Sequence, residues 1–319
     1  MSFPNISDII ATTIDSRTRK IADNVTANNA LLSKLSLKGK IKTASGGVKI
    51  LQELSFAENS NQGWYSGYDL LPVGVSDVLS AAEFDWKQAA VPVVISGLEM
   101  LQNSGRERMI DLMEGRLGVA ESTIANLISD GLYSDGTGSA GKEITGLDAA
   151  IPVDPTTGTY GGIDRATFTF WRSQVQTVTV TAANVQQTMN ALWASQVRGS
   201  DRPDLLLMDN LFWQIYVASL QAQQRFNSPE VGNLGFPTLK FMDADVVLDG
   251  GIGGFVPAST MFSLNCDYIF YRPHADRNMV SLSPNRRYST NQDAEVQILA
   301  WAGNLTTSGS RYQGRINGA

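Results

Sequence analysis

One long stretch, residues 97–138, carries a helical pattern that no other part of the chain matches. Its apolar side chains recur about every 3.6 residues, which places them in one stripe along a helix. The members of this stripe are Met109, Met113, Leu117, Ile124, Ile128 and Leu132. A helix from about Leu98 to Ser134 would be roughly 50 Å long at ~1.5 Å per residue. That length suits a structural strut better than a globular enzyme domain.

Both ends of this helix carry boundary signals. Ser96 followed by Glu99 forms a capping box, in which two side chains satisfy the free amides at the start of a helix. Gly131, Gly136 and Gly138 supply stop signals at the other end. The sequence therefore predicts where the helix begins and ends as well as which face it buries.

The composition describes a folded protein with unusually few charges. A chain of 319 residues can bury a large core and corresponds to about two domains. Charged residues make up 18%, whereas about 25% is typical of soluble domains. This favours a protein that covers much of its surface with copies of itself. We expect no membrane segment, because no apolar run approaches the ~20 residues that a spanning helix needs. Nor do we expect a secretory signal.

Positive charge is concentrated near the N-terminus, although the net charge is −6. Two short apolar stripes, at 6–21 and 31–37, cannot form a core alone, so this arm should dock on something else. The arm either faces an acidic partner or DNA, or is a solvated helix face. The candidate inward-facing basic residues are Arg17, Arg19, Lys20, Lys38, Lys40 and Lys42.

From Val48 the apolar period changes to two, which predicts a half-buried strand up to Phe56. A second strand is predicted at Phe84, Trp86 and Ala90, and a loop of about 25 residues lies between the two. A two-stranded ribbon is marginal alone in water, so we expect it to lie across a neighbouring subunit. The candidate contact residues are Trp64, Tyr65, Tyr68, Phe84 and Trp86.

The second half of the chain predicts a mixed α/β block at about 180–285. We expect a helix capped by Thr181 and running through Val197, and another from Asn210 to about Gln224. Strands are predicted at 204–208, 239–241, 246–248, 261–264 and 268–271, with one more strand at 295–302.

The sequence carries no recognisable catalytic set, so we predict an ordinary building block with no catalytic, cofactor-binding or metal-binding residue. His274 is the only histidine and Cys266 the only cysteine, which we expect to be a buried thiol. The chain has no P-loop motif. Residues 136–141 match G-x-G-x-x-G literally, but they follow a helix, whereas a dinucleotide site follows a strand.

The order of these parts resembles the major capsid protein of tailed bacteriophages, which has the Hong Kong 97-type fold. VVISGLEMLQNSGRERMIDLMEGRL, followed by NLISDGLYSDGTG and ITGLDAAI, is similar to the family's spine helix and the turn after it. GFPTLKFMDADVVLD and FSLNCD resemble its axial domain, and ILAWAGNLTTSGSRYQGRI resembles its terminal strand. Together these stretches cover most of the chain from about Val48 onward.

The resemblance implies an α+β fold with an N-terminal arm, an extended two-stranded loop, a long spine helix in a peripheral domain and a mixed α/β axial domain. The implied boundaries are 1–47 for the arm, 48–96 for the extended loop, 97–179 and 286–319 for the peripheral domain, and 180–285 for the axial domain. The implied function is that of a coat protein that forms hexamers and pentamers and closes into an icosahedral shell around double-stranded DNA.

The implied location is the virion, after assembly in the host cytoplasm. The implied partners are other copies of the chain, a portal protein, decoration proteins and packaged DNA that is contacted non-specifically. Only about 45 residues precede the ribbon, so we expect a separate scaffolding protein in place of an N-terminal scaffolding segment. No cofactor is implied.

Two alternatives remain open at this point. An encapsulin-like nanocompartment shell has a similar topology, although its ribbon is usually shorter. A cytoplasmic α/β hydrolase that uses carboxylates is the second alternative, and it would be a monomer or a small oligomer.

Overall fold

The computed structural model describes residues 29–71, 73–102, 106–220, 238–249, 254–282, 287–288 and 293–318. The helices are α2 (Ala30–Leu37), α3 (Gly97–Gln102), α4 (Arg106–Tyr133), α5 (Gly138–Gly141), α6 (Leu147–Ala150), α7 (Val185–Gln196) and α8 (Asn210–Leu220), with 3₁₀ turns η1 (Thr169–Trp171), η3 (Cys266–Tyr268) and η4 (Ser310–Tyr312). The strands are β1 (Ile50–Ser55), β2 (Leu79–Phe84), β3 (Lys87–Ser96), β4 (Thr159–Tyr160), β5 (Ile163–Asp164), β6 (Gln174–Thr177), β7 (Leu205–Met208), β8 (Thr238–Phe241), β9 (Ala244–Leu248), β10 (Thr260–Leu264), β11 (Ile269–Pro273), β12 (Val280–Ser281), β13 (Arg287–Tyr288), β14 (Ala294–Thr307) and β15 (Gly314–Asn317).

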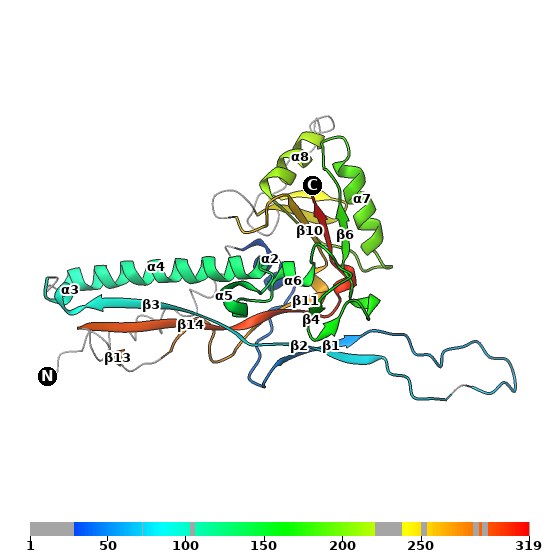
Figure 1. Ribbon diagram of the computed structural model, residues 1–319, viewed down its shortest axis with the longest axis horizontal. Coiled ribbons are helices and arrows are strands. Elements are labelled where there is room, and N and C mark those ends of the chain that lie inside the picture. Colours follow the sequence, from blue (N-terminus) through cyan, green and yellow to red (C-terminus); the bar gives the residue numbers. More distant parts are fainter. Residues whose placement is uncertain are drawn as a thin grey trace.

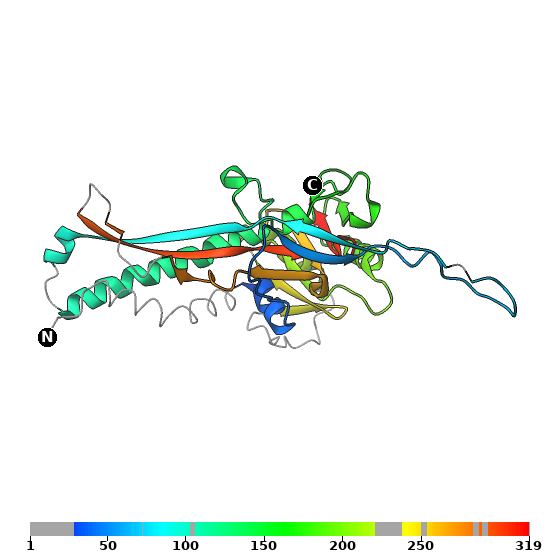
Figure 2. The ribbon, with the colours of Figure 1, turned by 90° about the horizontal axis from the view of Figure 1, so that it is seen from below.

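The molecule is elongated, with a long spine at one end and a thin ribbon at the other (Figure 1). The spine consists of α4, β3 and β14, which run side by side in both views (Figures 1 and 2). A six-stranded sheet with α7 and α8 rises beside one end of the spine, at the upper right of Figure 1. The loop between β1 and β2 extends away from the body on the side opposite the spine.

The predicted spine helix is present as α3 and α4, and residues 103–105 between them lie outside the described part of the chain. With 28 residues, α4 is about 42 Å long at ~1.5 Å per residue. The predicted apolar stripe is confirmed wherever its side chains are described. Its buried members are Leu117, Ile124, Ile128 and Leu132. The side chains of Met109 and Met113 lie outside the described residues.

The predicted capping box at the start of α3 is confirmed. The Glu99 carboxylate accepts hydrogen bonds from the backbone N–H and the hydroxyl of Ser96, both at 3.1 Å. In return, Ser96 Oγ accepts the backbone N–H of Glu99 at 3.3 Å. Arg116 of α4 donates to the Glu99 carboxylate and to the carbonyl of Val94. This one guanidinium therefore ties the end of β3 and the start of α3 to the spine helix.

β3 pairs with β14 along its whole length, and this corrects one predicted strand. We expected a single strand over Phe84–Ala90 that completes the ribbon. Instead β2 pairs with β1 and ends at Phe84, whereas β3 starts at Lys87 and enters the five-stranded sheet. The buried side chain of Asn304 donates to the carbonyl of Asp85 at 2.9 Å and fixes the chain between the two strands.

The six-stranded sheet, in the order β6-β15-β10-β7-β9-β8, is buried on both faces. In its central strand β7, successive side chains point alternately into two different cores. Leu205 and Leu207 belong to the large core shared with the spine, whereas Leu206 and Met208 belong to a second core under α7 and α8. A strand covered on both faces needs apolar residues at every position, which explains the run Leu-Leu-Leu-Met.

Several strands lie in a different large sheet from the one that the predicted domain boundaries imply. β6 and β15, predicted in the peripheral segments 97–179 and 286–319, lie in the six-stranded sheet. β11, predicted in the axial segment 180–285, pairs with β14 in the five-stranded sheet, and so does β3 from the predicted loop 48–96. The predicted limits therefore differ from the edges of the sheets, because pairing joins segments that no local pattern marks.

The helix predicted from Thr181 begins later, at Val185. The side-chain oxygen of Asn184 accepts the N–H of Thr181 at 2.7 Å, and its amide donates to the carbonyl of Thr179 at 2.9 Å. Residues 179–184 therefore form a turn of their own. Cys266 is buried as expected, and it lies in the η3 turn.

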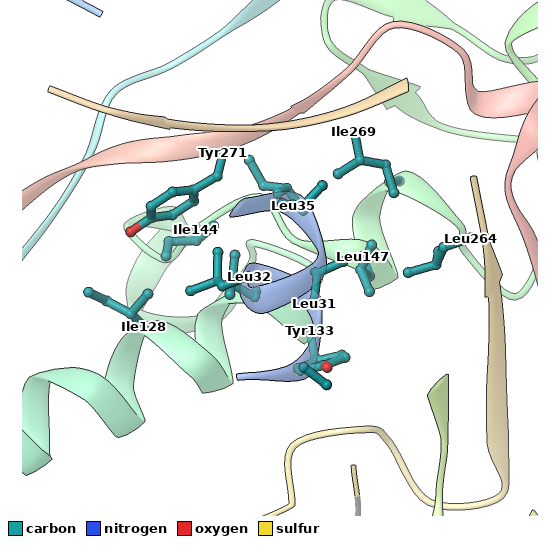
Figure 3. Packing of buried hydrophobic residues seen from close by; sticks show 14 of the residues in the cluster. Leu31, Leu32, Leu35, Ile128, Tyr133, Ile144, Leu147, Leu264, Ile269 and Tyr271 are labelled. Carbon is teal, nitrogen blue, oxygen red and sulfur yellow. The ribbon is translucent and has the colours of Figure 1, made fainter. Parts of the chain in front are cut away.

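α2 lies at the joint between the spine and the six-stranded sheet (Figure 3). Leu31, Leu32 and Leu35 are completely buried there. The residues labelled around them come from α4, α6, β10, β11 and the segment before α6: Ile128, Tyr133, Ile144, Leu147, Leu264, Ile269 and Tyr271. The prediction that this stripe docks on something else is confirmed, and its partner is the core of its own chain. The predicted stripe at 6–21 lies outside the described residues.

Shortening Leu32 to alanine should lower the free energy of unfolding of the unassembled subunit by about 2–5 kcal/mol, because a completely buried leucine leaves a cavity. Leu37→Ala, at the exposed end of the same helix, should change it by less than ~0.5 kcal/mol. Urea unfolding measures both variants. Equal losses would contradict the role given to α2.

Ser96→Ala should lower the free energy of unfolding by about 1 kcal/mol, because it removes one half of the capping box. Ser122→Ala is the matched control, since its hydroxyl bonds only a carbonyl of its own helix, that of Gly118 at 3.0 Å. Thermal unfolding followed by circular dichroism compares the two. A loss at Ser96 no larger than at Ser122 would mean that the capping box contributes nothing to stability.

Candidate assembly surfaces

The ribbon tip, residues 56–78, is exposed over most of its length. Trp64 and Tyr68 lose no surface to the rest of the chain, at 106% relative exposure each, and Tyr65 is 67% exposed. The exposed aliphatic side chains of the tip are Leu70, Leu71, Val73 and Val75. An apolar patch of this kind on a soluble protein marks a surface for binding another molecule.

Few hydrogen bonds hold the two limbs of the tip together. The N–H of Phe56 bonds the carbonyl of Val78 at 3.1 Å, and the side-chain amide of Asn61 bonds the carbonyl of Gly74 at 2.7 Å. The backbone N–H and the hydroxyl of Ser60 bond Ser76 Oγ at 3.2 and 3.3 Å. A backbone segment with so few contacts opens at low free-energy cost. The tip is therefore able to adjust its shape to a partner surface.

The other two predicted contact aromatics lie at the base of the ribbon and pack within their own subunit. Phe84 is only 3% exposed and meets the ring of Tyr160 edge to face at 5.2 Å. The indole N–H of Trp86 donates to the carbonyl of Gly47 at 2.9 Å, and its ring lies 5.1 Å from that of His274. Phe84 thus has little surface left for a neighbour, whereas Trp86 is half-buried.

Lysines of the arm bind carboxylates beside the six-stranded sheet. Lys34 Nζ lies 2.6 Å from Asp245, and Lys38 Nζ lies 2.9 Å from Asp204 and 3.0 Å from Asp267. Burial lowers the pKa of Lys38, but its hydrogen bonds and attraction to the two aspartates outweigh this, so the pKa is raised. The stabilisation is therefore present through neutral pH and is lost only as the pH rises through that raised pKa.

Lys40 and Lys42 lie around the ring of Phe270. Each ammonium is 5.2 Å from the ring centroid, and the Arg272 guanidinium is 5.5 Å from it. Lys40 also donates to the carbonyl of Asp267 at 3.0 Å. Lys40, Lys42 and Arg272 form a group that we call the Phe270 cluster. The candidates Arg17, Arg19 and Lys20 lie outside the described residues.

Two further polar contacts cross the joint. Arg315 of β15 donates to Asp148 of α6, and Tyr133 at the end of α4 donates to Asp249, which follows β9. Burial raises the pKa of Asp249, and the hydrogen bond from Tyr133 partly opposes that shift. These contacts fix α4 and α6 to the six-stranded sheet.

Cys266 and His274 are the two residues of catalytic interest in the described part of the chain. Burial raises the pKa of the Cys266 thiol well above its usual range, which disfavours the nucleophilic thiolate. His274 accepts the backbone N–H of Asp276 at 3.1 Å and touches no nucleophile in the contacts described. Within the described ranges, no group of three or more histidine, cysteine or acidic side chains is placed to hold a metal ion. None of the helices in the same ranges has the length and apolar character needed to cross a bilayer.

A scan against protein-family models finds no match, and a search of curated proteins finds none either. Solved structures do match. Against the capsid asymmetric unit of cyanophage A-1(L), the TM-score is 0.61 at 16% identity, over 87% of this chain and 90% of that one. Against the capsid of a native GTA particle, the TM-score is 0.62 at 12% identity, over 89% of this chain and 90% of that one.

A third match covers almost the whole chain. It is to the procapsid of satellite phage P4, which includes the size determination (Sid) protein, with a TM-score of 0.51 at 10% identity over 99% of this chain and 92% of that one. At such low identity these likenesses establish the fold. The α+β prediction is confirmed, and the chain has the Hong Kong 97-type fold of the capsid subunits of tailed phages.

Proposed function

We propose that this chain is the major capsid protein of a tailed bacteriophage. Copies of it form hexamers and pentamers, and these close into an icosahedral shell that encloses double-stranded DNA. The observation that carries this proposal is the ribbon tip. An aromatic, exposed loop projects from a fold that capsid subunits share, and the described part of its own chain does not cover it. A neighbouring subunit in a shell is the natural cover.

The parts of the fold take the following roles in this proposal. The six-stranded sheet with α7 and α8 forms the axial domain near the centre of each capsomer. The spine of α4, β3 and β14 forms the peripheral domain, and the β1–β2 ribbon is the extended loop over the adjacent subunit. The chain acts as a structural protein of the virion, is assembled in the host cytoplasm and has no enzymatic role.

Assembly of such a shell needs partners besides other copies of the chain. The matched P4 procapsid includes a size determination protein, which supports a similar class of assembly partner here. We propose a separate scaffolding protein and a portal protein, with decoration proteins as a further class.

Packaged DNA is the remaining partner, contacted without sequence preference through its phosphates. Lys38 and Lys40 already have acidic partners within the chain. Among the three candidate arm lysines, Lys42 of the Phe270 cluster is therefore better placed to contact a DNA phosphate. The proposal that Arg17, Arg19 and Lys20 also face DNA rests on their charge alone.

Deleting residues 60–78 tests the proposal. The subunit should stay folded, because the described side chains of this segment are largely exposed, with the same circular dichroism and nearly the same unfolding midpoint. Assembly into particles should fail or give fragile shells, as followed by light scattering and electron microscopy.

A Gly/Ser loop of equal length in place of residues 60–78 is the matched control, because it keeps the loop but removes the aromatic contacts. It should fail to assemble in the same way. Normal particles from this variant would contradict the role of the tip, and unfolding of the deleted subunit would show that the ribbon belongs to the core.

A further inference from the structure

A small cavity lies where the last turns of α4, the start of β3 and the segment around α5 meet. It has a volume of about 260 Å³, and its lining comes from residues within 87–90, 127–131 and 139–144, together with Trp301 of β14. In Figure 1, α5 lies next to the end of α4. Lys87 donates to the carbonyl of Gly141 at 2.5 Å and so ties β3 to the segment of α5. The cavity therefore has walls from three separate elements, as ligand sites commonly do.

The buried part of the lining is apolar but includes a hydrogen-bond donor without a partner. Ile128, Ile144 and Trp301 are at most 5% exposed. The buried indole N–H of Trp301 makes no hydrogen bond in the described part of the chain. The ring of Tyr271 stacks on Trp301 at 5.9 Å, and its hydroxyl lies near this N–H without hydrogen-bond geometry. An unsatisfied buried donor is costly, so a ligand oxygen beside Trp301 would remove that cost.

Tyr271 supplies a second polar group on the same side. Figure 3 shows its hydroxyl on the side of the ring that faces Ile144, which lines the cavity. Two polar hydrogens, one on an indole and one on a phenol, thus lie at an otherwise apolar surface. A flat ligand with one oxygen at its inner end matches this arrangement.

The outer part of the lining carries positive charge that the described chain does not neutralise. Lys142 is exposed and forms no ion pair among the described residues, and Lys87 bonds a carbonyl. Glu143 accepts the hydroxyls of Ser134 at 2.9 Å and Ser139 at 3.2 Å, so its carboxylate is already satisfied. Asp130 is the other carboxylate in the lining and is exposed. A ligand carboxylate at the outer end would find an unpaired ammonium in Lys142.

The wall formed by α5 has an unfavourable backbone. Ser139 and Ala140 have φ angles of 51° and 58°, and Gly141 follows at 77°. For residues with a side chain, this left-handed conformation costs roughly 1–2 kcal/mol each. Such strain persists only where the surrounding structure holds it, and it is found at ligand clamps. Ser139 is itself one of the lining residues.

We propose that this cavity, which we call the Trp301 pocket, binds a small aromatic carboxylate with a second oxygen at the far end of its ring. The ring packs on Ile128, Ile144 and Trp301. The far oxygen accepts the indole N–H of Trp301, and the carboxylate pairs with Lys142. A bound ligand of this kind connects α4, α5 and β3 and stabilises the subunit. The proposal does not rest on the proposed function.

Binding to the full-length, unassembled subunit with ¹⁵N-labelled tryptophan side chains tests the proposal. 4-Hydroxybenzoate should shift one of the six indole N–H resonances in a saturable manner. That resonance should be the one missing from Trp301→Phe. Benzoate, which lacks the far oxygen, should bind about threefold to tenfold more weakly. 4-Hydroxybenzyl alcohol, which lacks the carboxylate, should bind about twofold to fivefold more weakly.

Two pairs of variants locate the site. Ala89→Leu should abolish the shift, because Ala89 lines the cavity and a larger side chain fills part of it. Ala81→Leu is its matched control, on an exposed position of β2 outside the cavity. Lys142→Gln should weaken binding about twofold to fivefold, whereas Arg311→Gln, which removes an exposed charge elsewhere, should leave it unchanged.

Three results would each overturn the Trp301 pocket. These are a saturable shift at no indole group or only at others, equal binding to the two leucine variants, and tighter binding of the alcohol than of the carboxylate. If Trp301→Phe or Ala89→Leu does not fold, the comparison of Lys142→Gln with Arg311→Gln still decides. Particle formation is a separate measurement, so the shell function stands or falls independently of this pocket.

Discussion

The burial of three leucines of α2 holds the two halves of this subunit together. Leu31, Leu32 and Leu35 fill the space between the end of α4 and strands of both large sheets, and none of them is exposed. An isolated helix of this length is marginal in water, so the stability of α2 depends on packing its leucines into this space. Lys34 of the same helix and Lys38, the residue that caps its C-terminus, bind aspartates beside the six-stranded sheet. The orientation of the six-stranded sheet on the spine therefore depends on a segment that is far from both in sequence.

The ribbon tip differs from this joint in how few contacts it makes with the rest of the chain. The spine is one continuous arrangement in which β14 pairs with β3, and Arg116 connects β3, α3 and α4. The ribbon tip, in contrast, has few internal contacts and many exposed apolar side chains. Subunits built this way present a fixed frame with an adaptable arm. In the proposed shell, one modest contact between each arm and one neighbour, repeated over many copies, would add up to a strong closed structure through multivalency.

Local patterns made part of this fold predictable. The stripe from Leu117 to Leu132 and the capping box of Ser96 and Glu99 depend on residues within a few turns of one helix, and both are confirmed. The division between β2 and β3 was missed because it depends on Asn304, a residue more than two hundred positions away. The strands β6 and β15 were missed for a similar reason, since both are short and depend on distant partners: β6 pairs with β15, and β15 also pairs with β10.

The candidate assembly surfaces also combine features that the local sequence predicts with features that depend on distant contacts. Exposure of Trp64 and Tyr68 follows from a loop that lacks any apolar periodicity, whereas the burial of Phe84 under Tyr160 depends on a hairpin beyond the spine helix. The ion pairs of Lys38 with Asp204 and Asp267 join segments that no spacing rule connects.

Electron microscopy of particles purified from the native source, combined with nucleic-acid staining, shows whether this chain forms a viral shell. We predict closed icosahedral shells of pentamers and hexamers that enclose double-stranded DNA. A protein-filled shell without DNA would contradict the phage assignment and favour a nanocompartment. A stable 34.5 kDa monomer at every salt concentration and pH would contradict a shell protein of any kind.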